Sequence, residues 1–247
     1  MKHDTKNKTR VRKTAERPFR IISKDAPFPY VEAYKSLRTN LNFMAVSNEY
    51  KKILVTSALP EEGKSNVAVN LAVSLAENDA KVLLVDCDLR KPVLHKYLRI
   101  NRQMPGITSV LGESVNLSDA IVRFTDINID VITAGVIPPN PAELLGSKRM
   151  EELLKTLSLT YDYIIFDTPP VSLVTDAAVL GRLTDGAIMV IRPHYATVDA
   201  AQLAKRRLES AGVNIIGAVL NGFDAKSAAY NRGYYYSYNY NYYRQKE

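Results

Sequence analysis

The segment from Thr56 to Ser65 constrains the fold more than any other part of this sequence. A β-rich run at residues 53–55 leads into Thr-Ser-Ala-Leu-Pro-Glu-Glu-Gly-Lys-Ser, and an Ala/Val/Leu-rich helical pattern follows directly. A strand, a loop ending in Gly-Lys-Ser and a helix form a P-loop, in which backbone N–H groups and the positive end of the helix surround a phosphate. The segment therefore predicts an α/β domain that binds a nucleotide.

Each part of the phosphate chemistry has a residue in this loop. The lysine of a P-loop pairs with β- and γ-phosphate oxygens and the next hydroxyl faces Mg²⁺, and here these residues are Lys64 and Ser65. Ala58 replaces the usual first glycine, and the charges of Glu61 and Glu62 beside a polyphosphate predict that both side chains point outward. An incidental strand-to-helix turn is the alternative, which the flanking strand and helix disfavour. The predicted nucleotide contacts in this segment are Ser57, Ala58, Glu62, Gly63, Lys64, Ser65 and Asn66.

Strand-like and helix-like runs alternate along the rest of the chain. The predicted strands cover residues 52–57, 81–86, 128–133, 162–167, 185–191 and 214–220, and the predicted helices cover 29–46, 64–78, 116–124, 141–158, 175–183 and 197–210. This alternation predicts an α/β fold of the P-loop NTPase class, with a mostly parallel sheet and helices on both faces. Ligands of such sheets bind beyond the carboxyl ends of the strands.

Two further strand ends carry carboxylates. The run at 82–85 leads into Asp86-Cys87-Asp88, and the run at 163–166 leads into Asp167. One aspartate after a strand is more often a turn or cap residue than a catalyst. Two such ends beside one P-loop match the needs of phosphoryl transfer, which are Mg²⁺ to neutralise charge and a carboxylate to accept the hydroxyl proton. The sequence therefore predicts ATP and Mg²⁺ as cofactors.

The N-terminal end differs from the body in charge. Residues 1–20 hold eight Lys/Arg against two Asp/Glu, which is +6 of the net charge of +7. We expect a basic flexible arm at 1–27 and no nucleic-acid partner, because phosphate-tracking proteins spread positive charge over the folded surface. A solvated disordered end and a weak attraction to an anionic membrane leaflet both remain open for the arm. The absence of a membrane-spanning run or a secretion signal predicts a cytoplasmic location.

Tyrosines crowd the C-terminal end. Eight of the fifteen tyrosines lie in the last eighteen residues, among few aliphatic side chains. This composition predicts a disordered tail at 226–247 after a P-loop domain at 28–225. A tail that stacks on nucleic acid or on itself is the alternative to a substrate segment. The predicted phosphorylation sites are Tyr230, Tyr234, Tyr235, Tyr236, Tyr238, Tyr240, Tyr242 and Tyr243.

These motifs resemble those of the bacterial tyrosine kinases of capsule and exopolysaccharide production, the BY-kinases. The loop at 56–65 is similar to the family's Walker A form, although Glu61 stands where glycine is more usual. The segment from Asp86 to Arg90 is similar to its Asp-x-Asp-x-Arg motif, Asp167-Thr-Pro-Pro to its Walker B form, and residues 135–145 to its Pro-Pro-Asn-Pro loop. The resemblance covers the chain from about Pro29 to its end.

The resemblance implies specific roles. Asp86 would act as general base with Asp88 in support, and Lys64 would contact phosphates as part of the catalytic set. Ser65, Asp88 and Asp167 would hold Mg²⁺. Asn221 is similar to a nucleotide-base contact of related ATPases, while a simple turn residue is the equal alternative. The implied activity is an ATP-dependent protein-tyrosine kinase that autophosphorylates its tail in trans and regulates capsular or exopolysaccharide biosynthesis.

The resemblance also implies assembly and partners. Glu32, Lys35 and Arg38 are similar to a family motif that forms a homo-oligomeric ring, and their spacing places them on one helix face. The other implied partners are protein substrates, a cognate tyrosine phosphatase and a transmembrane activator whose cytosolic tail would bring the protein to the inner face of the membrane. The rival class is a ParA/MinD-like ATPase positioning switch. Leu59 stands where those switches carry a signature lysine.

Overall fold

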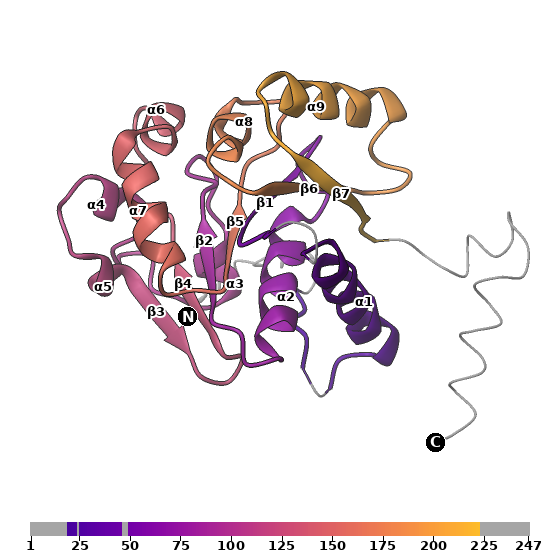
Figure 1. Cartoon of the computed structure of the whole chain (residues 1–247), viewed down its shortest axis with the longest axis horizontal. Coiled ribbons are helices and arrows are strands. Elements are labelled where there is room, and N and C mark those ends of the chain that lie inside the picture. The colour runs from indigo at the N-terminus through magenta and orange to yellow at the C-terminus, as the bar shows by residue number, and fades with distance from the viewer. Residues whose placement is uncertain (1–18, 24, 46–48, 223–247) are drawn as a thin grey trace, which may run out of the picture.

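The computed structural model describes residues 19–23, 25–45 and 49–222. One seven-stranded sheet has the strand order β3-β4-β2-β5-β1-β6-β7, with helices on both sides (Figure 1). Only the β3–β4 pair is antiparallel. The strands are β1 Lys52–Ser57, β2 Val82–Asp86, β3 Ile121–Phe124, β4 Ile129–Ile132, β5 Tyr163–Asp167, β6 Gly186–Ile191 and β7 Ile215–Leu220. The helices are α1 Phe28–Ala45, α2 Lys64–Ala76, α3 Leu94–Tyr97, α4 Ile107–Leu111, α5 Leu117–Ala120, α6 Pro141–Leu145, α7 Lys148–Ser158, α8 Asp176–Gly181 and α9 Val198–Ser210.

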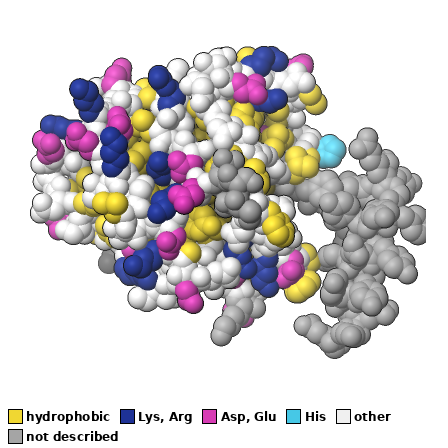
Figure 2. All heavy atoms as spheres, in the orientation of Figure 1, with side chains coloured by type: hydrophobic (Ala, Val, Ile, Leu, Met, Phe, Trp, Pro, Cys, Tyr) yellow, Lys and Arg dark blue, Asp and Glu magenta, His cyan; other side chains and the backbone are white. Residues whose placement is uncertain are grey.

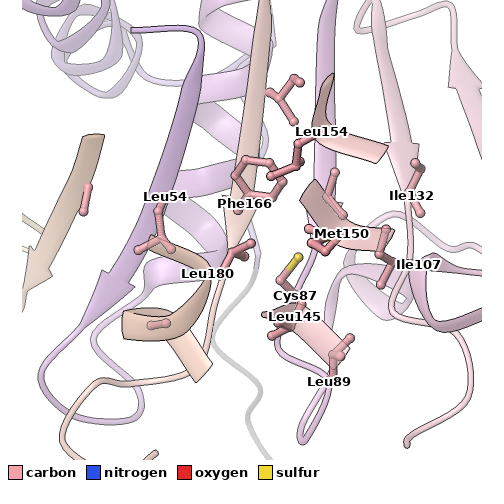
Figure 3. Close-up of a cluster of buried hydrophobic side chains, with 14 of the residues drawn as sticks. Leu54, Cys87, Leu89, Ile107, Ile132, Leu145, Met150, Leu154, Phe166 and Leu180 are labelled. Carbon is pink, nitrogen blue, oxygen red and sulfur yellow. The ribbon is translucent and has the colours of Figure 1, made fainter. Parts of the chain in front are cut away.

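Both faces of the sheet are buried, and successive strand residues fill two different cores. In β1, Ile53 and Val55 pack with residues of α1 and α2, whereas Leu54 packs with residues of α7, α8 and α9. Figure 3 shows the second core, where Phe166 of β5 meets Leu154 of α7 and Leu180 of α8. The predicted α/β architecture with helices on both faces is therefore confirmed.

Two predicted helices are wrong in detail. Residues 116–124 form the short helix α5 and then the edge strand β3, because the Ile-Val-Arg-Phe run suits a half-buried strand. Arg123 lies opposite Asp130 of β4 in this strand pair and forms an ion pair of 3.0 Å with it. The helix predicted at 141–158 is broken after α6, where Ser147 caps α7 by accepting a hydrogen bond from the Met150 N–H.

The folded body begins before residue 28, the predicted start of the P-loop domain. Ile22 is buried in the core with α1 and α2, and its N–H donates to the Asn70 side chain at 2.7 Å. Phe19 stacks on Tyr97 with ring centroids 4.2 Å apart. The part of the predicted arm at residues 19–23 is thus packed against the domain, while residues 1–18 lie outside the described residues.

The surface of the described body carries both signs of charge. Figure 2 shows Lys/Arg and Asp/Glu side chains interspersed over one face, with no large area of a single sign on that face. This agrees with the nearly neutral body deduced from the sequence. Across residues 19–23, 25–45 and 49–222, no helix has the length and apolar character needed to cross a membrane.

Candidate active site

The P-loop occupies the space between the end of β1 and the start of α2. β1 ends at Ser57 and α2 begins at Lys64, with Ala58 buried at the start of the loop. Glu61 (φ 62°) and Gly63 (φ 88°) both have left-handed backbone, which glycine adopts freely and which costs a residue with a Cβ about 1–2 kcal/mol. The loop therefore curls around the N-terminus of a thirteen-residue helix, where backbone N–H groups lack intrahelical acceptors and suit a phosphate.

The two predicted acidic strand ends lie beside this loop. β5 is the neighbour of both β1 and β2, and the register pairs Asp167 with Val55 on one side and with Asp86 on the other. Asp86 and Asp167 are both fully buried. The three strand ends that the sequence predicted to converge thus meet at one edge of the sheet.

Lys64 faces the second aspartate of the Asp-x-Asp motif. Its Nζ lies 3.0 Å from a carboxylate oxygen of Asp88, whose other oxygen accepts a hydrogen bond from the Lys91 N–H at 3.0 Å. The Asp86 carboxylate accepts hydrogen bonds from the Asp88 and Leu94 N–H groups, at 3.2 and 3.1 Å. Backbone N–H groups that follow β2 therefore fix both carboxylates. Asp86 is buried at the end of β2, and Asp88 pairs with Lys64.

Burial and mutual repulsion set the electrostatics of this cluster. Burial raises the pKa of Asp86 well above its ordinary value, and the charge of Asp167 raises it further. Burial also raises the pKa of Asp167 to about 6, against the opposing effect of the Lys64 charge. Burial lowers the pKa of Lys64, but Asp167 and Asp88 outweigh it and the net pKa lies above the ordinary value. A single ammonium thus serves several buried carboxylates.

Asp167 provides the test of whether these residues fit Mg²⁺. Both of its carboxylate oxygens are buried without a hydrogen bond of normal geometry among the described residues, although the neighbouring Ser65 hydroxyl lowers the pKa of the group. Such a carboxylate is costly unless a ligand completes the site. Ser65, at the start of α2, is also buried. The described residues contain no group of three or more His, Cys, Asp or Glu side chains arranged for a metal. Mg²⁺ commonly takes one or two protein carboxylates together with water and substrate phosphates, so Ser65 and Asp167 fit a nucleotide-bound ion.

The prediction that Glu62 points outward is wrong. Its side chain is fully buried, and its carboxylate accepts hydrogen bonds from the Leu59 N–H at 2.6 Å and the Arg192 N–H at 3.1 Å. Two backbone donors satisfy the carboxylate inside the loop, which offsets the cost of burying its charge. Glu61, in contrast, is exposed as predicted.

The structure places the other predicted nucleotide contacts as follows. The Ser57 hydroxyl donates to the Leu59 carbonyl at 2.7 Å, within the loop. The Asn66 side-chain oxygen accepts hydrogen bonds from the Tyr30 and Tyr34 hydroxyls of α1, so this side chain faces α1.

Asn221 lies against the P-loop, at the end of β7. Its side-chain amide donates to the Glu62 carbonyl at 2.8 Å. A Cβ on Gly63 would stand 1.9 Å from the Asn221 amide nitrogen, so any other residue here would have to displace the Asn221 side chain and adopt left-handed backbone. The base contact predicted for Asn221 is a proposal that its position beside the loop supports.

The three predicted oligomerisation residues do not all face solvent. Lys35 and Glu32 form a partly exposed ion pair of 2.8 Å on α1. Arg38 instead reaches α2, where it bonds the Ser74 carbonyl and lies 2.7 Å from a Glu77 carboxylate oxygen. Arg38 therefore has a role within one subunit, whatever it contributes to a ring.

Two interactions near the site were not predicted. Arg90 forms a two-pronged ion pair with Asp176, at 2.8 and 2.9 Å, which ties the loop after β2 to α8. Asp176 is fully buried, but in sequence it is indistinguishable from an ordinary first-turn acid. The Arg192 side chain, the first after β6, lies 3.4 Å from the Glu61 carbonyl and stacks over Tyr195. Its place at a strand end is the one signal that could have indicated it.

The predicted tail and the basic residues 1–18 lie outside the described residues. The eight predicted phosphorylation sites belong to residues 230–243 and therefore have no described position. β7 ends at Leu220 as a parallel neighbour of β6, so the chain leaves the sheet at the same edge as the P-loop.

Comparisons with known proteins agree with this geometry. Residues 50–209 match the family described as an AAA domain. The chain is 43% identical over 191 residues to tyrosine-protein kinase YwqD of Bacillus subtilis strain 168, covering 77% of this chain and 80% of that protein. It is 40% identical over 210 residues to tyrosine-protein kinase etk of Escherichia coli strain K12, covering 85% of this chain but only 29% of that protein.

Among solved structures, a tyrosine-kinase domain is more similar to this chain than a MinD protein is. The kinase domain of Escherichia coli tyrosine kinase ETK superposes with a TM-score of 0.77 at 40% identity, covering 88% of each chain. The septum site-determining protein MinD from Pyrococcus horikoshii, solved with Mg-ADP, gives a TM-score of 0.60 at 26% identity, covering 72% of this chain and 76% of that chain.

Proposed function

This chain belongs to the bacterial tyrosine-kinase family, and on that premise we propose that it uses Mg-ATP to phosphorylate tyrosines of its own C-terminal segment on a second copy of the chain. The chain is a protein-tyrosine kinase of the P-loop fold. The observation that carries the proposal is the meeting of Lys64, Asp86 and Asp167 at one sheet edge.

The nucleotide site follows from these residues. ATP would lie along the P-loop with its phosphates at the N-terminus of α2, and Asn221 is placed to reach the base. Ser65, Asp88 and Asp167 would hold Mg²⁺, which neutralises charge that develops on the phosphates. The Mg-ADP bound to the related MinD supports the same ligand here.

Phosphoryl transfer then needs one bond made and one broken. The phenol oxygen of the incoming tyrosine bonds to the γ-phosphorus, the bond from that phosphorus to the β,γ-bridging oxygen breaks, and ADP leaves. The phenol proton passes to the Asp86 carboxylate as the new bond forms, since a phenol with a pKa near 10 need not ionise beforehand. The Lys64 ammonium would leave Asp88, bind phosphate oxygens and stabilise the negative charge that moves during the transfer.

The tyrosine cluster is the proposed substrate because of where the chain leaves the sheet. β7 ends at the catalytic edge, and a flexible segment of roughly twenty residues spans about 25 Å on average. That length lets its hydroxyls reach the site of a neighbouring subunit in a ring. Each phosphotyrosine adds about −1.5 to −2 charges, so phosphorylation would drive the subunits apart and a cognate phosphatase would restore assembly.

A transmembrane activator is the remaining proposed partner. The chain spans 80% of its Bacillus relative but 29% of the Escherichia coli one. The ground for this partner is the family relationship to transmembrane-associated tyrosine kinases. The activator's cytosolic tail would bring the kinase to the inner face of the membrane, where it regulates capsular or exopolysaccharide biosynthesis by acting on further protein substrates.

Incubation of the purified protein with Mg-ATP, with and without the activator's cytosolic peptide, tests the proposal. Mass spectrometry should find phosphotyrosine in the C-terminal segment of the wild type. Asp86→Asn should abolish it, whereas a variant with every C-terminal tyrosine changed to Phe should still modify an added substrate. Full labelling of Asp86→Asn would refute the assignment of the base. Nucleotide hydrolysis without any tyrosine labelling would favour the MinD-like switch.

A further inference from the structure

Glu62 makes two contacts that a phosphate-binding loop does not require. Its carboxylate joins the N–H of Leu59, in the first half of the P-loop, to the N–H of Arg192, just past the end of β6. The distances are 2.6 and 3.1 Å. We name this pair of hydrogen bonds the Glu62 bridge.

The surroundings of the bridge show why a carboxylate is tolerated there. A fully buried charge is costly unless hydrogen bonds and nearby positive potential compensate it. The described residues include no Lys, Arg or His side chain within ion-pair distance of Glu62. The two backbone donors and the N-terminal end of α2, which begins two residues later, supply the compensation.

The loop around Glu62 needs support from outside itself. Left-handed backbone flanks it on both sides, at Glu61 and Gly63, and the first of these carries a side chain that disfavours the conformation. Asn221 closes the far side, since its amide bonds the Glu62 carbonyl and occupies the space beside Gly63. Residues after β6 and after β7 thus hold the curled segment 61–63 in place.

We propose that Glu62 is a positioning residue that holds the P-loop in its phosphate-binding shape before the nucleotide arrives. A loop that must be ordered on binding loses affinity in proportion to the fraction of molecules in the competent shape. The bridge keeps that fraction high by fixing the loop to the rigid end of β6. This inference rests on the nucleotide-binding part of the proposed function and is independent of the tyrosine substrate.

Titration of the full chain with a fluorescent ADP analogue in the presence of Mg²⁺ tests the bridge. Glu62→Gln keeps the size of the side chain but can accept from only one of the two N–H groups with its single oxygen. Loss of a charge-assisted hydrogen bond corresponds to roughly tenfold or more in an equilibrium constant. We expect the Kd for the analogue and the KM for ATP to rise by up to that factor, since the apparent Kd follows the fraction of molecules with the loop in the competent shape. The value of kcat at saturating Mg-ATP should fall by less than KM rises.

Glu61→Gln is the matched comparison. It removes the same charge one position away, from an exposed side chain, and should tighten ADP binding because a negative charge near the phosphates is lost. Opposite effects of the two substitutions support the bridge, while tighter binding by both would show that Glu62 acts only as a charge and would overturn it. Unchanged affinity in Glu62→Gln would also overturn it. If the wild type binds no nucleotide, the nucleotide-binding part of the proposed function is wrong, and the proposal for Glu62 falls with it.

A measurement on the wild type guards against a variant that does not fold. Hydrogen exchange without nucleotide should show the amides of Leu59 and Arg192 protected, because both donate to the bridge. Exchange of the Leu59 amide at the rate of an unbonded loop residue would contradict the proposal without any substitution.

Discussion

Replacement of Asp167 by Asn should change how the stability of the nucleotide-free protein depends on pH. The carboxylate is fully buried, and neither oxygen has a hydrogen bond of normal geometry among the described residues. Burial raises its pKa from 3.8 to about 6. The folded protein therefore holds this proton more tightly than the unfolded chain does.

The sign and size of the effect follow from that difference. Well below pH 3.8 both states are protonated and the group does not destabilise the fold. Between about pH 4 and 6 the unfolded chain ionises first, so the free energy of unfolding falls as pH rises. A difference of about 2.2 pKa units at 1.36 kcal/mol each amounts to about 3 kcal/mol, fully expressed above pH 6. The neutral amide of Asp167→Asn removes this dependence. It also removes the charge that helps to raise the pKa of Asp86, which changes the pH dependence in the same direction.

Urea denaturation at a series of pH values, with a chelator and without nucleotide, measures the effect. The free energy of unfolding of Asp167→Asn minus that of the wild type should rise by at least about 2 kcal/mol from pH 4 to pH 6.5, because part of the effect is already present at pH 4. Any fixed effect of burying an amide cancels, because only the change with pH is used. Asp126→Asn, at an exposed position, reports what the same replacement does on the surface.

A difference that stays flat from pH 4 to pH 6.5 would refute the reasoning, because the carboxylate would then titrate alike in both states. A second arm adds Mg-ADP at neutral pH. The wild type should gain stability through binding, and Asp167→Asn should gain much less because the ion loses a ligand. Equal gains would place the metal elsewhere.

Three further predictions concern the P-loop, the loop after β2 and helix α1. Glu61→Gly should raise the free energy of unfolding by about 0.5–1 kcal/mol in denaturant titrations, since glycine relieves the left-handed strain but loses more chain entropy; a loss of stability would contradict the strain. Arg90→Ala should lower thermal stability by about 2 kcal/mol because it leaves the buried Asp176 uncompensated, and the added change Asp176→Asn should recover part of the loss. Arg38→Ala should destabilise the monomer by about 1 kcal/mol through its two contacts on α2, whereas Lys35→Ala, in a partly exposed pair, should have almost no effect. Equal effects of the last two on monomer unfolding would show that Arg38 is not held within the subunit.

The sheet and the convergence of its loops could be predicted from the sequence alone. Strands buried on both sides read as continuous apolar runs, and a Gly-Lys-Ser loop between strand and helix has few other uses. Parallel strands place all their carboxyl ends at one edge. The meeting of Asp86 and Asp167 at that end of the sheet therefore followed from the sequence, whereas the strand order that makes them direct neighbours did not.

Contacts between distant segments were not predictable in the same way. Glu62 was expected to avoid a polyphosphate, because a sequence shows its charge and not the Arg192 N–H that comes from another strand. Arg38 was read with its helix neighbours, although its partners lie on α2. The 121–124 run was read as helical because the β4 strand that pairs with it cannot be seen locally.

The site is therefore built to be completed by its ligand. The three buried carboxylates of Asp86, Asp88 and Asp167 share one lysine. Lys64 pairs with Asp88, and burial raises the pKa of Asp167. A protein without ligand gains nothing from this arrangement, since a hydrophobic replacement would be at least as stable. Magnesium at Asp167 and phosphates at Lys64 would reverse the balance, because each supplies the charge that its partner lacks. The same lack of positive charge that lowers stability at neutral pH would thus provide affinity for the magnesium nucleotide. Asp167→Asn separates the two effects, because the variant should be more stable at neutral pH and should bind the magnesium nucleotide more weakly.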